Sequence, residues 1–449
     1  MRIFPKLIYI IIIFSNILVF QECCALVDEN IQPNIDPAFS KIEAEILDSI
    51  KKKRIPGCAI AIVYRNQIVK IGGYGYRSLG KEDRIDADTV FQLGSVSKPI
   101  AATLASQLEY RGLLKLDAPV RQYLPGFALK GVKDPNSLKV KYVLSHTTGI
   151  PRGGFNNLIE NYTPYETIVE KLQKVPVKGA VGTKYDYNNA MYSLISTISE
   201  SATHQPFQKS LSMYLLQPLH MTRTTTTLEG IMNTSNHAMP HTVTKKRLIP
   251  LETYSSGYYT VAPAGGINST ARDMANFLRA QMGGYPEVLS PSMLQRIQTP
   301  QIATKSMLHS QSSKEFPIKN SYYGLGWRIT DFGEEKLIFH GGWLKGFTNF
   351  IGFLPNKQLG IIILHNGDSK FSAKTAVRFL SLVLNPKATL TDKVMDNLKP
   401  TKKLKMKKKG ATNMRYTKAN QKTKQKLVQK KLTRQAKAKR IQKNKLAAN

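Results

Sequence analysis

The chain has 449 residues, 42% of them hydrophobic, so it is long enough to bury a large core. It carries 65 Lys and Arg against 30 Asp and Glu, which gives a formal net charge of +35. It has only three cysteines, and no second long apolar run follows the first 25 residues. These features argue against a disulfide-rich scaffold and against an integral membrane domain.

The first 25 residues have the pattern of a secretory signal peptide. Two basic residues precede 14 almost entirely apolar ones, Leu7 to Phe20. Small residues at Cys23 and Ala25 occupy the positions that a signal peptidase recognises, so cleavage after Ala25 is predicted. The alternatives are an uncleaved membrane anchor and lipidation at Cys23 or Cys24. We therefore expect an exported protein, periplasmic or secreted, with membrane association in either alternative case.

Hydrophobic periodicity then predicts a helix, a hairpin and a second helix. Apolar residues at helical spacing indicate a helix over residues 37–52. Two strands come next, over 57–64 and 67–74, joined at Arg65-Asn66, which is a hairpin signal. An extended segment over 89–94 leads into an apolar helical run from Pro99 to Leu114.

The junction before that run carries Ser95-Val96-Ser97-Lys98. Positions three apart share one face of a helix, so the Ser95 hydroxyl and the Lys98 ammonium can meet. Serine becomes an effective nucleophile when a neighbouring base takes its proton, and a desolvated lysine can be that base. The tetrapeptide also arises often by chance, so its weight depends on the motifs later in the chain.

A second segment, Tyr187-Asn188-Asn189, supplies groups that suit the same chemistry. A tyrosine hydroxyl beside a lysine can relay a proton, and an asparagine amide can both donate to and accept from a bound amide. The structural alternative for Tyr187 is a half-buried aromatic residue of a helix.

A third segment, His340-Gly341-Gly342 followed by Trp343, ends a predicted strand over 336–339. Such a glycine pair lets a substrate backbone lie close, while the histidine supplies a polar contact. The structural alternative for His340 is a strand-end histidine whose hydrogen bonds are made within the fold. Further strands are predicted over 324–330, 347–354 and 359–364, and a last helix over 372–384. Strands at both ends with helices between them indicate an α+β fold, one sheet with an inserted helical region.

In this order, the three motifs make the chain resemble the serine β-lactamase and penicillin-recognising enzyme family. The branch it resembles contains class C β-lactamases, DD-carboxypeptidases and esterases, which carry Ser-x-x-Lys, Tyr-x-Asn and Lys-Thr-Gly or His-x-Gly. Segments 144–150, 263–267 and 323–327 also look like signatures of that branch. The resemblance runs from about residue 37 to about residue 385. It implies a β-lactamase/transpeptidase-like fold, an antiparallel sheet flanked by helices beside a mostly helical region.

The resemblance also implies an exported serine hydrolase that acts on amide or ester substrates through an acyl-enzyme on Ser95. Lys98 would take the hydroxyl proton, and Tyr187 would relay protons toward the leaving group and later from water. D-alanyl peptides, esters and β-lactams are the candidate substrates. The alternative is a penicillin-binding sensor or scaffold with little turnover.

Four further residues would bind the substrate if the resemblance holds. The backbone N–H groups of Ser95 and Trp343 would hold the oxyanion, and Asn189 would bind an amide of the acyl group. His340 would face a substrate carboxylate or polarise Tyr187, and Gly342 would let the substrate backbone lie close. The β-lactamases proper have a lysine at the position of His340, so the histidine weakens the case for efficient β-lactam hydrolysis.

No cofactor or metal is predicted. The chain has neither a His-Glu-x-x-His motif nor a cysteine cluster, and Pro240 between His237 and His241 argues against a shared helical face. The expected partner is a small-molecule or peptide substrate, and no nucleic-acid partner is expected. Nothing in the sequence indicates an oligomeric state.

Residues 386–449 are predicted to form a disordered basic tail outside a hydrolase domain of residues 26–385. From Thr401 to Asn449 there are 19 Lys or Arg and no Asp or Glu, which leaves a net charge of +16 on the rest of the chain. The segment has one aromatic residue, Tyr416, and too few large aliphatic ones to form a core. It could instead contact an anionic membrane or envelope polymer, at ~1 kcal/mol per basic residue near the surface.

Overall fold

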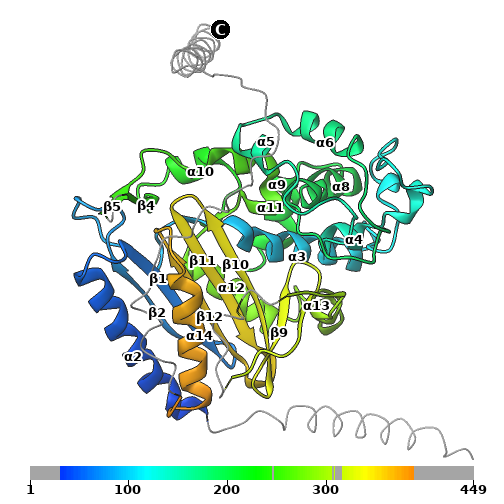
Figure 1. Cartoon of the computed structure of the whole chain (residues 1–449). Coiled ribbons are helices and arrows are strands. Elements are labelled where there is room, and N and C mark those ends of the chain that lie inside the picture. The colour runs from blue at the N-terminus through cyan, green and yellow to red at the C-terminus, as the bar shows by residue number, and fades with distance from the viewer. Residues whose placement is uncertain (1–30, 245–246, 306–307, 309–315, 389–449) are drawn as a thin grey trace, which may run out of the picture. The chain divides into compact units, whose positions relative to one another are not determined.

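The structure is a computed structural model that describes residues 31–244, 247–305, 308 and 316–388. An eight-stranded antiparallel sheet with helices on both faces forms its centre, which confirms the predicted fold class (Figure 1). The predicted signal peptide and nearly all of the predicted tail lie outside the described residues. Among the described helices, none has the length and apolar character needed to span a membrane.

The sheet joins the two ends of the described chain. Its strand order is β2-β1-β12-β11-β10-β9-β8-β7, so the first hairpin pairs directly with the last strand. The turn of that hairpin is Arg65-Asn66, where both residues have positive φ (46° and 61°), as the tight turn requires. The strands are β1 (Gly57–Tyr64), β2 (Gln67–Gly75), β7 (Ile302–Ala303), β8 (Ser321–Tyr323), β9 (Arg328–Phe332), β10 (Glu335–Leu344), β11 (Phe347–Leu354) and β12 (Leu359–His365).

Alternate residues of the central strands face two different helical layers. On β1, Ile60 and Ile62 contact the layer formed by α2 (Gln32–Lys51) and α14 (Phe371–Leu384). Ala59 and Ala61 contact the opposite layer, which contains α3 (Ser97–Tyr110) and α12 (Ala271–Gln281). Both faces of the sheet are therefore buried, which explains why β1, β11 and β12 are buried along their whole length and consist mostly of apolar residues. Figure 1 shows α2 and α14 lying together against the sheet.

The first helix begins earlier than the predicted residue 37. It starts at Gln32, with one proline in its first turn and Pro37 inside it. The proline in the first turn costs little because the N–H it lacks has no partner there, whereas Pro37 removes one hydrogen bond from the helix. The added turn buries Ile35, and Asn34 donates to the carbonyl of Val383 on α14 at 2.9 Å. Packing against α14 thus decides where the helix begins.

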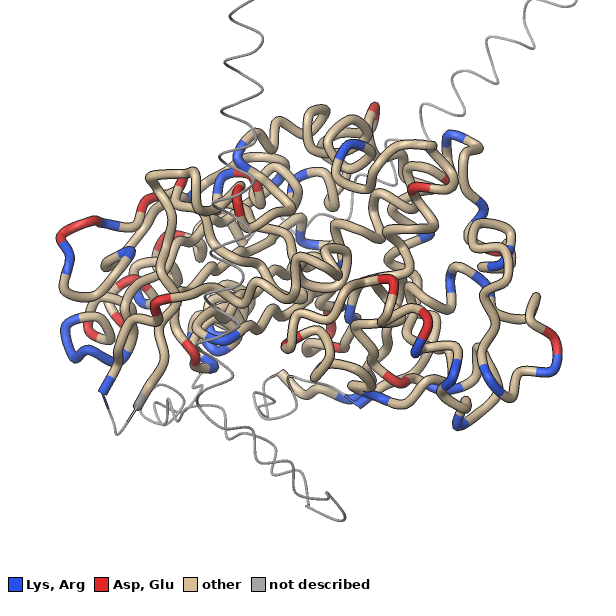
Figure 2. The backbone as a smooth tube through the Cα atoms, turned by 90° about the horizontal axis from the view of Figure 1, so that it is seen from above, with Lys and Arg blue, Asp and Glu red and all other residues tan. Residues whose placement is uncertain are grey.

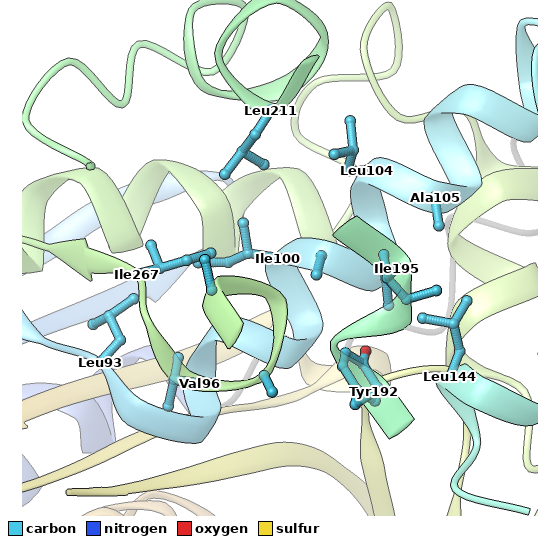
Figure 3. Close-up of a cluster of buried hydrophobic side chains, with 14 of the residues drawn as sticks. Leu93, Val96, Ile100, Leu104, Ala105, Leu144, Tyr192, Ile195, Leu211 and Ile267 are labelled. Atoms are coloured by element: carbon cyan, nitrogen blue, oxygen red, sulfur yellow. The ribbon is translucent and has the colours of Figure 1, made fainter. Parts of the chain in front are cut away.

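The remaining helices lie between β2 and β7 in the sequence and surround α3. Figure 3 shows Ile100, Leu104 and Ala105 of α3 within a cluster of buried apolar side chains from several of these helices. They are α4 (Val140–Leu144), α5 (Asn156–Glu160), α6 (Tyr165–Gln173), α7 (Asn189–Tyr192), α8 (Leu194–Thr203), α9 (Phe207–Leu211), α10 (Leu228–Met232), α11 (Ala262–Gly265) and α13 (Pro291–Gln298). Two small sheets pair β3 (Phe91–Gln92) with β6 (Asn268–Ser269) and β4 (His241–Thr244) with β5 (Arg247–Pro250).

Charged residues are spread over the outer loops and helices, with both signs interspersed (Figure 2). Lys98 and Arg328 are exceptions, since their side chains are 0% and 7% exposed. A buried cation needs hydrogen-bond acceptors or a shifted pKa to be tolerated, so these two residues mark a special environment within the fold.

Candidate active site

Ser95 lies in a 3₁₀ turn, η2 (Gly94–Val96), directly before α3. The preceding Gly94 has a φ of +56°, a left-handed conformation that glycine adopts without strain. A Cβ atom at Gly94 would lie 3.0 Å from both the backbone N and the backbone O of Trp343. The turn therefore brings the candidate nucleophile next to the backbone of β10.

The Lys98 ammonium group reaches Ser95 from the first turn of α3. Its Nζ donates to Ser95 Oγ at 3.2 Å, to Asn189 Oδ1 at 2.7 Å and to the carbonyl of Ala264 at 2.6 Å. Burial lowers the pKa of Lys98 well below its usual value, and the charge of Arg328 acts in the same direction. Both effects favour the neutral amine, which is the form that can accept a proton from serine.

Tyr187 lies on the other side of the serine hydroxyl. Its phenol donates to Ser95 Oγ at 2.8 Å. Burial raises the pKa of Tyr187, although Arg328 and the hydrogen bond to Ser95 act in the opposite direction. The phenol is therefore protonated near neutral pH and can pass a proton on. Ser95 Oγ is thus contacted by one group able to accept a proton and one able to donate it.

Local hydrogen bonds fix the Tyr187 segment. Asn188 caps α7 by accepting from the backbone N–H of Met191 at 2.9 Å, as expected for an asparagine at a helix start. The backbone N–H of Asn188 donates to His146 Nδ1 at 3.2 Å, and the imidazole lies 4.2 Å from the ring of Tyr187. His146 belongs to the Leu-Ser-His-Thr segment (residues 144–147), so this segment helps to hold Tyr187 and Asn188 in place.

Asn189 is 7% exposed and connects two other side chains. Its Oδ1 accepts from Lys98, and its Nδ2 donates to Asn156 Oδ1 at 3.1 Å. The sequence predicted that Asn189 binds an amide of the substrate. In the structure the oxygen of its amide already serves Lys98, so a substrate would have to be recognised through the amide nitrogen.

The His340-Gly341-Gly342 segment does not end a strand, as the sequence suggested, but lies inside β10. The strand continues to Leu344 because β11 pairs with it from Ile338 to Leu344, with Gly342 opposite Asn349 and Trp343 opposite Thr348. β9 pairs with β10 only as far as Phe339. The backbone from residue 341 onward therefore lies beyond the pairing with β9, next to Gly94.

Close packing against the backbone of Leu93 requires a glycine at position 342. A Cβ atom there would lie 2.0 Å from the carbonyl oxygen of Leu93, far inside van der Waals contact. The Trp343 side chain is 47% exposed, and its indole N–H donates to Asp368 at 2.6 Å. Because Gly342 has no side chain, β10 can lie directly against the serine turn, and the backbone of Trp343 lies at this contact.

His340 differs from the expectation that it faces a substrate carboxylate. Its side chain is buried, and Nδ1 lies 2.9 Å from the carbonyl of Gly341, so Nδ1 carries the hydrogen. Nε2 then accepts from the hydroxyl of Tyr323 at 3.1 Å. Burial, together with the charges of Arg328 and Lys98, lowers the pKa of His340 well below its usual value. The imidazole is therefore neutral, and both of its nitrogens are engaged within the fold.

Sequence reasoning missed Arg328. This residue begins β9 directly after Trp327, and its guanidinium lies 5.5 Å from the ring centre of Tyr187 and 5.4 Å from that of Tyr323. Within the part of the chain that the structure describes, its Nε has no hydrogen-bond partner. β9 reads Arg-Ile-Thr-Asp-Phe, so its sequence carries no pattern that singles out the arginine.

The described residues contain no group of three His, Cys, Asp or Glu side chains that could hold a metal ion. His241 accepts from the backbone N–H of Leu79 at 3.0 Å and donates to the carbonyl of Asn366 at 2.9 Å, so both ring nitrogens are used. The arrangement around Ser95 instead has the elements of covalent acyl transfer: a nucleophile, a desolvated base and a proton donor.

Comparison with known proteins assigns the family. The family described as Beta-lactamase matches residues 35–385, which is most of the chain. The chain belongs to this family. A solved structure described as an octameric penicillin-binding protein homologue from Pyrococcus abyssi has a TM-score of 0.67 and 25% identity, covering 77% of each chain.

Two relatives identified by sequence each share 24% of the aligned residues with this chain. Protein flp of Staphylococcus aureus is 24% identical over 358 residues, which cover 77% of this chain and 67% of that protein. A protein named Beta-lactamase from Yersinia enterocolitica is 24% identical over 348 residues, covering 71% of this chain and 84% of that protein. Family and fold together support a function of the serine hydrolase type, without specifying the bond that is cleaved.

Proposed function

We propose that this protein is an exported serine hydrolase that cleaves amide or ester bonds through an acyl-enzyme on Ser95. The observation that carries the proposal is the pair of contacts to Ser95 Oγ, from Lys98 at 3.2 Å and from Tyr187 at 2.8 Å. A serine hydroxyl that serves only the fold has no need of a buried lysine with a lowered pKa beside it.

The reaction can be derived from these contacts. Ser95 Oγ forms a bond to the substrate carbonyl carbon while neutral Lys98 accepts its proton. The tetrahedral intermediate then expels the leaving amine or alcohol, which takes a proton through Tyr187. A water molecule attacks the ester on Ser95 with the same groups moving its proton, and the serine is regenerated with release of a carboxylic acid.

The negative charge on the intermediate needs donors at the junction of the serine turn and β10. The backbone N–H groups of Ser95 and Trp343 are the proposed donors, since the close approach at Gly94 brings these two segments together. Loss of one such donor typically costs ~3 kcal/mol of transition-state stabilisation.

The buried charge of Arg328 favours substrates that carry a carboxylate. Its buried positive charge lies against Tyr187, whereas His340 is neutral and engaged. An anion held near this guanidinium would make a charge-assisted hydrogen bond of the stronger kind. D-alanyl peptides and β-lactams have such a group, so we place them ahead of neutral esters as natural substrates.

Labelling and turnover test the proposal. Intact-mass analysis after treatment with a fluorophosphonate or penicillin should show one adduct, absent from Ser95→Ala. Labelling that persists in that variant refutes the mechanism. A screen of nitrocefin, short-chain nitrophenyl esters and D-alanyl peptides should then show many turnovers per protein. A burst of one equivalent that stops there identifies a sensor or scaffold instead.

We further propose that the signal segment directs export and that the basic tail attaches the protein to anionic surfaces. The 19 positive charges from Thr401 to Asn449 support this, because they lie outside every motif of the hydrolase. Truncation after Pro400 should leave esterase turnover unchanged and abolish salt-sensitive binding to anionic vesicles. Equal vesicle binding by the truncated protein contradicts the attachment.

A further inference from the structure

Asn156 of α5 extends the hydrogen-bond chain that begins at Ser95. Lys98 Nζ lies 3.2 Å from Ser95 Oγ, Lys98 donates to Asn189 Oδ1, and Asn189 Nδ2 donates to Asn156 Oδ1 at 3.1 Å. The second sequence motif ends at Asn189, and none of the three motifs includes Asn156. The chain of hydrogen bonds therefore reaches one residue further than the resemblance implies.

The loop that carries Asn156 is anchored at several points. Asn188 Nδ2 donates to the carbonyl of Pro151 at 3.0 Å and to that of Gly154 at 3.3 Å. At the other end of α5, a Cβ atom on Gly257 would lie 2.0 Å from the carbonyl oxygen of Ile159, so this helix packs closely against η6 (Ser256–Val261). These contacts hold Asn156 in place relative to Asn189.

The hydrogen bonds to Lys98 and to Asn156 together decide which way the Asn189 amide is turned. A primary amide has nearly the same shape after a half turn, so its partners select the orientation. With the oxygen toward Lys98, the nitrogen meets the acceptor Asn156 Oδ1. The reversed amide would place its oxygen against Asn156 Oδ1 and its N–H groups against the donors of Lys98, and both contacts would be lost.

The orientation of Asn189 in turn directs Lys98. In the neutral amine, two N–H bonds point to Asn189 Oδ1 and to the carbonyl of Ala264, at 2.7 and 2.6 Å. The remaining direction, occupied by the lone pair, then faces Ser95 Oγ at 3.2 Å. We propose that Asn156 is a positioning residue for acyl transfer, holding the Asn189 amide so that the Lys98 lone pair faces Ser95. This inference rests on the proposed function.

Asn156→Ala tests the inference, with Asn157→Ala as a matched control on the exposed side of the same helical turn. In Asn156→Ala, kcat for p-nitrophenyl acetate and the rate of fluorophosphonate labelling should fall by about tenfold or more, with KM close to that of wild type. Asn157→Ala should match wild type in every measurement. The melting temperature of each variant reports whether it is folded.

The pH profile separates positioning from a purely structural role. Loss of a fixed acceptor destabilises the Lys98 ammonium, so the acid limb of kcat/KM should move to lower pH in Asn156→Ala. Asn156→Asp keeps an acceptor at the same place and adds a negative charge, so it should restore most of kcat and move that limb to higher pH.

Three results overturn the inference. The first is an Asn156→Ala variant with the kcat and pH profile of Asn157→Ala. The second is a higher KM with unchanged kcat, which would make Asn156 a substrate-binding residue only. The third is wild-type protein that is not labelled at Ser95, which refutes the proposed function as well. Normal wild-type labelling with an unaffected Asn156→Ala refutes the positioning role alone.

Discussion

Gly342→Ala should disable the protein through a single methyl group. The added Cβ would lie 2.0 Å from the carbonyl oxygen of Leu93, whereas ordinary van der Waals contact begins near 3.4 Å. Both atoms belong to the backbone or are fixed to it, so no side-chain rotation can relieve the clash. β10 and the serine turn must therefore separate by about 1 Å or more.

The expected loss depends on the groups that lie at this contact. The backbone of Trp343 comes directly after Gly342, and the Leu93 carbonyl precedes the serine turn by one residue. A displacement of about 1 Å between catalytic groups can cost ~100-fold in rate, and overpacking of this kind typically costs ~1–3 kcal/mol of unfolding free energy. We expect ester turnover to fall by about 100-fold while the protein still folds with a lower melting temperature.

Gly341→Ala provides the matched control one residue earlier on the strand. A Cβ atom there would have Asn349 O as its nearest neighbour, at 3.9 Å, so it should be tolerated. The assay is p-nitrophenyl ester hydrolysis together with active-site titration by a fluorophosphonate and thermal unfolding. A Gly342→Ala variant with wild-type turnover, or a Gly341→Ala variant that is equally impaired, would refute the reasoning.

The charges and hydrogen bonds of the fold lead to three other predictions. Lys98→Met and Tyr187→Phe should each lower kcat by ~100- to 10,000-fold in folded protein; kinetics within a few-fold of wild type would mean that another base serves Ser95. Arg328→Met removes a charge that lowers the pKa of Lys98, so the acid limb of kcat/KM should move to higher pH, and an unmoved limb would contradict this. Burial lowers the pKa of His365 to about 3, so the free energy of unfolding falls as the pH decreases from about 6.5 toward 3 and is about 2 kcal/mol lower at pH 5 than at neutral pH. Urea unfolding at pH 7 and pH 5 should therefore show a weaker pH dependence for His365→Gln than for wild type. The same pH dependence in both proteins would contradict this.

The fold and the contact between Ser95 and Lys98 could be predicted because both depend on local patterns. Strand and helix periodicity reflects burial on both faces of the sheet, and Ser95 and Lys98 are neighbours on one helical turn. Tyr187 is far away in sequence, and only the resemblance to a family placed it beside them. The structure brings its hydroxyl within 2.8 Å of Ser95.

The features that sequence reasoning missed depend on packing between distant segments. Asn156 and Arg328 have no neighbouring motif that distinguishes them from other polar residues. The state of His340 is decided by Tyr323, which belongs to another strand, and by the carbonyl of Gly341. The strand that holds His340 extends further than its apolar pattern because β11 pairs with the glycines, and glycine itself carries no hydrophobic signal.

Lys98 and Arg328 have different proposed tasks near Ser95: Lys98 acts as the base, and Arg328 attracts the carboxylate of a substrate. A base must be neutral at the working pH, and burial lowers the pKa of Lys98 toward that state. A group that attracts a carboxylate must carry a positive charge, and the cation beside Tyr187 is the buried guanidinium of Arg328. A lysine at position 340 would add a further positive charge close to Lys98, whereas His340, with both nitrogens engaged, adds none. Arg328, which we propose attracts an anionic substrate, also lowers the pKa of Lys98, so one buried cation would serve both recognition and activation of the serine.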